Sequence, residues 1–332
     1  MTDWDYCEEI LPKVSRAFAL NIGRLRGETY RATLLGYLLF RIADTFEDSR
    51  VTCQKKIEAL HKCAQVFEGN KLLEKRLGLY ESLAEGLWGD KGSPEADLVK
   101  NGGRVFRCYF DLPATYREIM DPRIVETAFG MAKFQMRKEE TGQDIFQLRD
   151  LDELREYCYY VAGNVGVMLT QLFCLRDGLL KAKPKLVETQ IDFGLALQLA
   201  NIVKDHLKDL ERGWCYIPAS VIKIAEIREP EARGKILKEM VPHLVGHLDA
   251  TASYIEAIPY SEEDIRRFCL IPFVLAYNTL IEVESGKEKL TRPQVAAILG
   301  QCEEFSRSND LFRRDYRAAR RRLMAGAARP TS

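Results

Sequence analysis

The sequence predicts an all-α protein built as one large helical domain. Apolar residues recur at the three- and four-residue spacings of helices, and strand-like alternation bounded by turn residues is nearly absent. Clusters containing Gly and Pro divide the 332 residues into helix-length pieces, with no long linker and no repeat of fixed period. We therefore expect a single helical domain over residues 1–325 and a disordered tail over 326–332.

Two long segments show the helical spacing most clearly. Over 31–46 and over 186–211, apolar residues keep to one helical stripe. These residues are Leu34, Leu35, Leu38, Leu39, Ile42 and Phe46 in the first segment, and Leu195, Leu199, Ile202 and Val203 in the second. Helix breaks are predicted at 89–94, 111–113, 121–122, 181–184, 228–230 and 284–286, where Gly, Pro and polar residues gather.

Composition excludes several classes of protein. The 49 Lys and Arg residues balance the 49 Asp and Glu residues, so no global field indicates a nucleic-acid partner. The nine cysteines are scattered singly, and with four histidines they form no zinc spacing, so reduced thiols in a cytoplasmic protein are expected. The start does not resemble a signal peptide, and no apolar run reaches the roughly 20 residues of a membrane-spanning helix.

A polar stripe interrupts the first apolar helix. Asp44 and Asp48 are four residues apart, so their carboxylates lie about 40° apart on one helix face. Arg41 and Tyr37 continue the same face at spacings of three and four residues. A solvated helix surface can also produce paired acids, and this alternative stays open for either pair taken alone.

A second polar stripe, Gln198, Asn201, Asp205 and Asp209, runs along the segment 186–211. Two such stripes facing each other would surround a cavity with oxygen ligands, which suit Mg²⁺. Because carboxylates cannot bind a diphosphate directly, they would act through metal ions that hold and ionise it.

Five motifs then resemble the squalene and phytoene synthase family, in the family's order and over most of the chain. They are Ser15-Arg16-Ala17-Phe18, Asp44-Thr45-Phe46-Glu47-Asp48, residues 157–166 from Tyr157 to Gly166, residues 197–209 and residues 212–218. The resemblance implies an isoprenoid synthase domain with a central cavity between the two aspartate-bearing helices. It also implies the joining of two farnesyl diphosphates through a cyclopropylcarbinyl diphosphate, with Mg²⁺ and, in squalene synthases, reduction by NADPH.

The resemblance also assigns roles to residues. Metal ligands would be Asp44, Glu47, Asp48, Asn201, Asp205 and Asp209. Substrate would meet Ser15, Arg16, Phe18, Gln198, Lys204 and Arg212. In the catalytic set, Tyr157 would assist the first step, Arg41 would clamp phosphate oxygens and Tyr37 would line the cavity. Arginine suits bidentate contact with phosphate oxygens, and a tyrosine can shuttle a proton or stabilise a cation. Gly163 and Gly166, with Tyr160, are expected to allow close helix packing rather than chemistry.

One position departs from the family pattern. An acid usually stands immediately before the last aspartate of the second motif, whereas this chain has Lys208 there. Neighbouring side chains on a helix point about 100° apart, so Asp205 and Asp209 can still bind metal. Lys208 either neutralises diphosphate or weakens metal binding.

A late motif favours the squalene branch. By composition alone, Phe268 and Cys269, followed by Pro272, are better explained by a buried helix with a proline kink, but their resemblance to the squalene synthase motif near the second-step cavity reverses that preference. Lys287, Lys289 and Arg292 lie where squalene synthases place basic residues associated with NADPH.

Alternatives remain at this stage. The aspartate motifs are shared with phytoene and dehydrosqualene synthases, which do not use NADPH, and the family includes non-enzymatic assembly factors. Six arginines between 313 and 322 can attract anionic lipid headgroups, so peripheral membrane contact is a further expectation. The sequence leaves the oligomeric state open.

Overall fold

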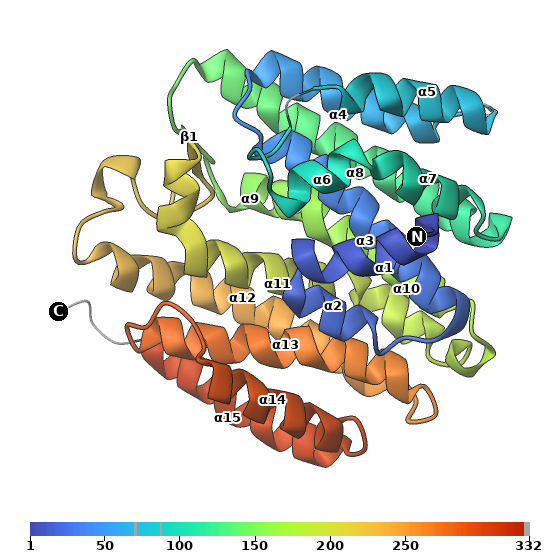
Figure 1. Cartoon of the computed structure of the whole chain (residues 1–332). Coiled ribbons are helices and arrows are strands. Elements are labelled where there is room, and N and C mark those ends of the chain that lie inside the picture. Colours follow the sequence, from blue (N-terminus) through green and yellow to red (C-terminus); the bar gives the residue numbers. More distant parts are fainter. Residues whose placement is uncertain (70–71, 87, 329–332) are drawn as a thin grey trace. The chain divides into compact units, whose positions relative to one another are not determined.

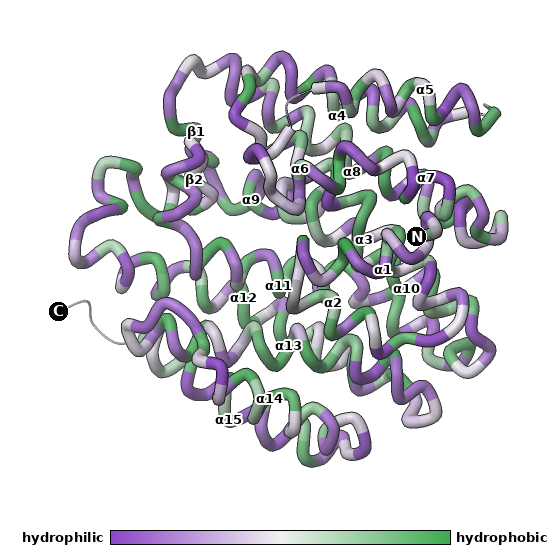
Figure 2. The backbone as a smooth tube through the Cα atoms, viewed as in Figure 1, coloured by the Kyte–Doolittle hydropathy of each residue, from purple (hydrophilic) through white to green (hydrophobic). Residues whose placement is uncertain are grey.

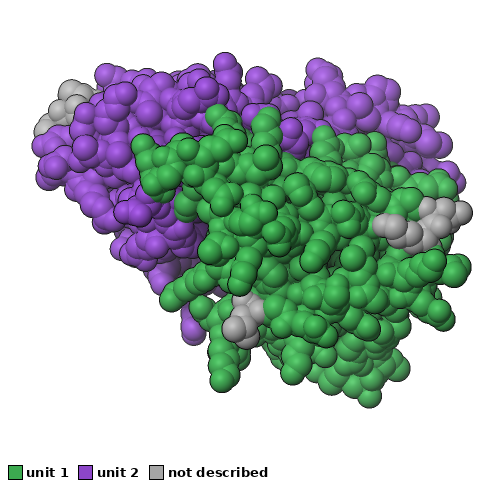
Figure 3. Space-filling view, turned by 90° about the horizontal axis from the view of Figure 1, so that it is seen from above, with its two compact units in different colours: residues 1–143, 171–173 green, residues 144–170, 174–332 purple. Residues whose placement is uncertain are grey.

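The structure of the chain is a computed structural model that describes residues 1–69, 72–86 and 88–328, with only the backbone described at 16 and 17. It is almost entirely helical, which confirms the predicted all-α class (Figure 1). Its residues form two compact units, 1–143 with 171–173 and 144–170 with 174–332, distinguished in Figure 3. The expectation of one domain over 1–325 stays a prediction.

The helices of the first part of the chain are α1 (Asp3–Val14), α2 (Arg16–Ile22), α3 (Gly27–Asp48), α4 (Cys53–Phe67), α5 (Leu73–Ala84), α6 (Pro94–Lys100), α7 (Gly102–Phe110) and α8 (Ala114–Thr141). The six predicted apolar residues of α3 are all buried, so the sequence pattern identified its core face. Helix α8 packs against α4 and α3, and an aromatic cluster of Phe67, Tyr80, Phe106 and Tyr109 fills the space between α4, α5 and α7.

The remaining elements are β1 (Phe146–Gln147), α9 (Leu151–Cys158), the π-helical turn η1 (Tyr159–Gly163), α10 (Asn164–Phe173), the 3₁₀ turn η2 (Asp177–Leu179), α11 (Lys183–Glu211), β2 (Trp214–Cys215), the 3₁₀ turn η3 (Ile224–Glu226), α12 (Ala232–Ala257), α13 (Glu263–Glu284), α14 (Arg292–Phe305) and α15 (Asn309–Ala327). In the second unit (144–170 with 174–332), α11 packs against α12, α13 and η1, and α15 packs against α12 and α13. The four predicted apolar residues of α11 are buried.

One predicted helix break is wrong, and the expected disordered tail over 326–332 stays a prediction. Helix α8 passes through Pro122 without ending, because Pro122 and Glu118 are both exposed and solvent can satisfy the carbonyl that loses its helical donor. Helix α15 continues to Ala327, two residues into the segment expected to be disordered, and residues 329–332 lie outside the described part of the chain.

Hydrophobic and hydrophilic residues alternate around the helices in Figure 2. Of the residues that the structure describes, no helix is long and apolar enough to cross a bilayer. All nine cysteines are free thiols, eight of them buried, as the scattered spacing predicted. The only sheet in the described part is a parallel pair in which Phe146 faces Trp214 and Gln147 faces Cys215.

Candidate active site

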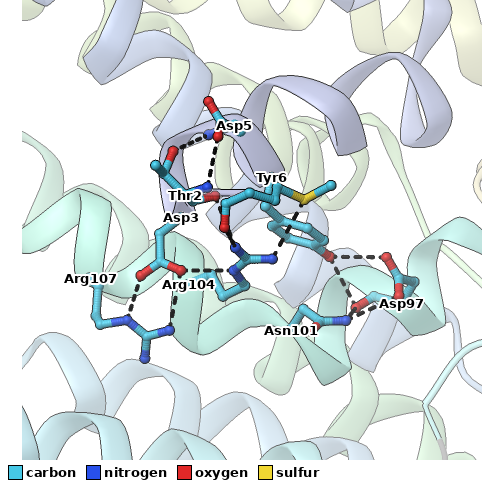
Figure 4. A network of polar contacts seen from close by, with 9 residues as sticks. Thr2, Asp3, Asp5, Tyr6, Asp97, Asn101, Arg104 and Arg107 are labelled. Carbon is cyan, nitrogen blue, oxygen red and sulfur yellow. Dashed lines mark hydrogen bonds and ion pairs between the residues drawn. The ribbon is translucent and has the colours of Figure 1, made fainter.

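A polar network fastens the N-terminal helix before the first motif begins (Figure 4). The Asp3 carboxylate accepts from Nε of Arg104 at 2.8 Å and from Nε of Arg107 at 2.6 Å. The Tyr6 hydroxyl donates to the Asp97 carboxylate at 3.1 Å, and the Arg104 guanidinium lies 4.9 Å from the Tyr6 ring centroid. These contacts hold α1 against α6 and α7, and so fix where the chain enters the next helix. No sequence motif signals them, because their partners are about a hundred residues apart.

The first motif forms the junction between α1 and α2. Ser15 ends α1 and caps α2, its hydroxyl accepting from the backbone N–H of Phe18 at 3.3 Å. The Phe18 ring lies 5.1 Å from the ring of Tyr37 on α3, so two predicted site residues are in contact. Burial raises the pKa of Tyr37, and the Ser15 hydroxyl and the Arg41 charge oppose this rise. The side chain of Arg16 lies outside the described residues.

The α3 stripe forms as predicted and gains a partner that the sequence did not indicate. A guanidinium nitrogen of Arg41 donates to Glu95 of α6 at 2.9 Å, and another lies 3.7 Å from Asp44. Burial lowers the pKa of Arg41, but the Asp44 and Glu95 carboxylates more than offset it, so the pKa is raised overall. Asp44 is half-buried and Asp48 is exposed. This face of α3 thus carries two accessible carboxylates beside an oriented cation.

Glu47 does not share this face. It is buried, and burial together with the charges of Asp48 and Asp44 raises its pKa to about 8, a rise that Lys56 opposes. One carboxyl oxygen of Glu47 has no hydrogen-bond partner among the described residues. Only Asp44 and Asp48 are therefore accessible metal-ligand candidates on α3.

The α11 stripe is a line of alternating charges. Asp205 lies between two lysines, with Lys204 Nζ at 2.8 Å and Lys208 Nζ at 3.0 Å, one on each carboxylate oxygen. Burial raises the pKa of Asp205, but both lysines oppose it and the pKa is lowered overall. Lys204 also donates to the Asn201 side-chain oxygen at 3.4 Å. Lys208, the residue that departs from the family pattern, is thus the direct partner of a predicted metal ligand.

The last aspartate of the stripe is held by the next motif. Asp209 is buried and pairs with Arg212, which immediately follows α11. Gln198 is half-buried about three turns before Asp209 on the same helix. The predicted substrate residues Lys204 and Arg212 therefore both lie beside predicted metal-ligand carboxylates in this unit.

Tyr157 and the motif after α11 come together in an aromatic stack. The Tyr157 hydroxyl donates to the Tyr216 hydroxyl at 2.9 Å, and their rings lie 4.5 Å apart and nearly parallel. Trp214 extends the stack, with its ring 5.4 Å from that of Tyr216. All three side chains are buried. Tyr216 is a site candidate that the residue-level prediction missed, although its motif was recognised.

Small residues allow the segment after Tyr157 to approach α11 closely. A Cβ added to Gly166 would stand 2.2 Å from the carbonyl oxygen of Gln190, and one on Gly163 would stand 2.7 Å from Leu195. A Cβ added to Gly194 would likewise stand 2.1 Å from the carbonyl oxygen of Ala162. The packing role expected for the two motif glycines is confirmed. The π-helical turn η1 lies at this contact, as such turns often do beside functional sites.

The late motif, which contains Phe268 and Cys269, lies in the hydrophobic core of the second unit. Phe268 and Cys269 are buried on α13, and burial raises the pKa of the Cys269 thiol, which therefore stays protonated at neutral pH. Near it, Tyr254 stacks on Phe193 at 5.5 Å and shares a hydrogen bond with Thr170. The arrangement can line an apolar space but does not present a reactive thiolate.

The predicted cofactor residues are exposed between α13 and α14. Lys287 pairs with Glu282 at 2.5 Å, while Lys289 and Arg292 are exposed. Glu288 of the same connection raises the pKa of Lys208, after the larger effect of Asp205, so this connection lies near the end of the α11 stripe.

The donor atoms of both stripes suit a hard divalent cation. Asp44 and Asp48 on α3, and Asn201, Asp205 and Asp209 on α11, offer carboxylate and amide oxygens, which Mg²⁺ prefers. The described residues contain no ready-made group of three or more His, Cys, Asp or Glu side chains. The two aspartate helices belong to different units, so each supplies only part of the predicted ligand set.

Known proteins resemble the chain along almost its whole length. The family model described as squalene/phytoene synthase matches residues 11–299. Squalene synthase of Nicotiana benthamiana is 29% identical over 92% of this chain and 72% of its own length. Squalene synthase 1 of Arabidopsis thaliana is 27% identical over 91% and 72%, respectively.

Solved structures share the fold. The complex of TcSQS with the ligand BPH1237 has a TM-score of 0.76 at 23% identity and covers 98% of both chains. A dehydrosqualene synthase in complex with ligand has a TM-score of 0.62 at 19% identity, covering 92% of this chain and 96% of its own. The helical fold and its aspartate helices define the class as an all-α isoprenoid synthase. The chain belongs to the squalene/phytoene synthase family, within which it is a prenyltransferase of the squalene synthase type.

Proposed function

We propose that this protein joins two farnesyl diphosphates head to head and reduces the product to squalene with NADPH. The observation that carries the proposal is the pairing of oxygen ligands with cations on both aspartate helices. Arg41 accompanies Asp44 on α3, and Lys204 and Lys208 flank Asp205 on α11. Such surfaces suit a metal-bound diphosphate, because they offer both ligands for the metal and charges for the phosphate oxygens.

Asp44, Asp48, Asn201, Asp205 and Asp209 would hold Mg²⁺ in this proposal. When bound, the metal would neutralise the diphosphate and make it a better leaving group. Arg41 and Arg212 would contact phosphate oxygens. Their guanidinium groups are already oriented by Glu95 and Asp209, which lowers the entropy lost on binding.

The aromatic stack would serve the carbocation. The Tyr157 hydroxyl has a fixed direction because it donates to Tyr216, so it can hold or pass a proton at one position. The stacked faces of Tyr157, Tyr216 and Trp214 can stabilise an allylic cation that develops beside them.

The second step requires exclusion of water, which would otherwise capture the rearranging cation. Phe268 and Cys269 form a buried apolar surface with an uncharged thiol, which suits this role. Hydride from NADPH would end the reaction, with Lys289 and Arg292 contacting the cofactor phosphate. In total, two farnesyl diphosphates, NADPH and a proton would give squalene, two diphosphates and NADP⁺.

Product analysis of the purified protein tests the proposal. We expect squalene from farnesyl diphosphate and Mg²⁺ only when NADPH is present, and the cyclopropylcarbinyl diphosphate without it. Asp205→Asn should remove both products. Glu188→Gln, an exposed acid of the same helix outside the motif, should not. Dehydrosqualene with or without NADPH would assign the protein to the other branch, and no turnover with farnesyl or geranylgeranyl diphosphate would favour a non-enzymatic role.

A further inference from the structure

Three connections between helices gather at one end of the second unit (Figure 1). The guanidinium of Arg176, between α10 and α11, donates to Glu262 at 3.0 Å and to Asp264 at 2.8 Å, at the start of α13. The backbone N–H of Asn309, at the start of α15, donates to the hydroxyl of Tyr260 at 3.0 Å. The α10–α11, α12–α13 and α14–α15 connections therefore lie next to one another.

A buried arginine stiffens this end. Arg266 is fully buried and donates to the backbone oxygens of Ile255 at 3.0 Å and Ser306 at 2.9 Å, at the ends of α12 and α14. Its guanidinium also lies 4.6 Å from the ring centroid of Tyr260. The charge is balanced by helix C-termini, which carry partial negative charge. The connections thus present a fixed surface.

Large apolar side chains are exposed at this end, which we call the leucine end. Among the described residues, thirteen large hydrophobic side chains are exposed, and five of them lie here. They are Leu175, Leu180, Val187, Tyr260 and Leu311. Leu180 is the most exposed of these, at 58%, in the connection that precedes α11. Such a concentration on a rigid surface indicates an interaction site rather than chance exposure.

The α10–α11 connection, which carries Leu180, is basic. Residues 174–187 contain four basic residues and one acidic residue. Arg176 is neutralised by Glu262 and Asp264, and Lys185 pairs with Glu188. Lys181 and Lys183 are exposed and form no ion pair within the described part of the chain. Two uncompensated lysines therefore stand directly beside Leu180.

We propose that the leucine end docks on the surface of an anionic lipid bilayer. Leu180 and its apolar neighbours would enter the interface between headgroups and acyl chains, and Lys181 and Lys183 would contact anionic headgroups. The apolar side chains come from separate connections, and the two exposed lysines follow Leu180 in one of them, so insertion and headgroup contact would occur at the same place. This docking is independent of the proposed reaction, because its test uses no substrate.

The arginine-rich helix α15 differs from this surface. Arg313 pairs with Glu256 and Arg320 pairs with Asp249, each at 2.9 Å, and Arg322 donates to the Ser285 hydroxyl at 3.0 Å, so three of its six arginines are already engaged. Apart from Leu311 at its start, the described part of α15 exposes no large apolar side chain. Helix α15 can add electrostatic attraction, but the leucine end supplies the residues that insert.

Vesicle co-sedimentation tests the proposal with full-length protein. The vesicles contain phosphatidylcholine alone or with roughly 30% phosphatidylglycerol, an anionic fraction that gives a negative surface potential. We expect binding to the anionic vesicles that weakens with salt. Leu180→Asp should weaken binding at least tenfold, and each of Lys181→Gln and Lys183→Gln about fivefold. Leu180→Trp should show blue-shifted fluorescence that brominated lipids quench.

Matched controls come from other surfaces. Met136→Asp changes an exposed apolar residue of α8, and Lys223→Gln with Lys238→Gln removes two exposed lysines elsewhere in the second unit. Both should leave binding within about twofold. Circular dichroism and thermal unfolding would verify that every variant is folded.

Three results would overturn the proposal. Unchanged binding of Leu180→Asp and of the lysine variants would show that this end does not meet the bilayer. Loss of binding in Arg314→Gln/Arg317→Gln/Arg321→Gln, with Leu180→Asp unaffected, would move the contact to α15. A wild-type dimer that Leu180→Asp converts to a monomer in sedimentation velocity, without effect on vesicle binding, would assign the leucine end to a second copy of the chain.

Discussion

At the scale of single residues, the aspartate motifs are sets of coupled charges rather than isolated ligands. Asp205 is held by Lys204 and Lys208, and Asp44 is held by Arg41. A metal ion would have to compete with these cations for the same oxygens. Lys208 is therefore a modulator of metal affinity in our interpretation, and its substitution measures that competition.

Lys208→Gln should keep turnover and lower the Mg²⁺ concentration needed for half-maximal activity. The Lys208 side of the ion pair is largely solvent-exposed, so its removal is worth about 0.2–1 kcal/mol, or up to about fivefold in apparent metal affinity. Steady-state rates across a Mg²⁺ titration measure the effect. A variant that needs more Mg²⁺, or that is inactive, would show that Lys208 instead assists diphosphate binding.

The raised pKa of Glu47 predicts how the stability of the protein depends on pH. Its folded pKa, about 8, is above the usual value near 4.5, so the folded state binds the extra proton between these values. The free energy of unfolding should therefore fall as pH rises from about 5 to 8. Glu47→Gln should reduce that fall and be the more stable protein at pH 9, by roughly 2–4 kcal/mol. Urea unfolding without Mg²⁺ at several pH values measures this, and parallel profiles for both proteins would contradict it.

At the scale of elements, close approach of backbones places the Tyr157 segment on α11. Gly166 and Gly194 stand against carbonyl oxygens, Gln190 and Ala162, which cannot move aside as a flexible side chain can. The helix positions therefore depend on the absence of a side chain at these residues. The same residues connect the aromatic stack to the helix that bears the second aspartate motif.

Gly166→Ala should destabilise the protein by about 1–3 kcal/mol, because its Cβ would overlap the Gln190 oxygen. The matched control is Gly246→Ala on α12, where an added Cβ meets nothing within 4 Å. That control should stabilise by about 0.5–1 kcal/mol through better helix propensity. Denaturant unfolding of both variants tests the pair, and equal effects would refute the close-packing account.

Helix assignment from the sequence worked because the apolar stripes of α3 and α11 have a strong helical period. It failed at Pro122, since an exposed helix surface tolerates the lost hydrogen bond that a buried one would not. The partners of Arg41 and Tyr157 were not predictable residue by residue. Glu95 is an ordinary acid in the first turn of α6, and Tyr216 faces Tyr157 only because β1 and β2 pair.

At the scale of the whole molecule, the charge is balanced and the fold is shared by the family, so the function depends on local sites. The protein has equal numbers of basic and acidic residues, so in the proposed function its attraction for diphosphate would come from the two stripes. Ligands that bind the folded state alone raise the unfolding temperature. The unfolding temperature therefore shows whether a ligand occupies the site, and no turnover is needed to measure it.

Mg²⁺ with inorganic diphosphate should raise the unfolding temperature by several degrees at saturating concentrations, and more than either does alone. Asp44→Asn and Asp205→Asn should each abolish most of the shift, while Glu188→Gln should keep it. Differential scanning fluorimetry measures all four proteins. Full shifts in both aspartate variants would contradict the assignment of these residues to the metal.

The sequence by itself determined the helical class, the two aspartate stripes and the family, because these depend on spacing along single helices and on local motifs. Tertiary structure alone decided that Glu47 is buried, that Arg41 on α3 pairs with Glu95 on α6, and that three connections meet at the leucine end. The physical reason is that burial and charge pairing depend on which surfaces of different helices come into contact. Periodicity within one helix gives the direction of a side chain but not its neighbours.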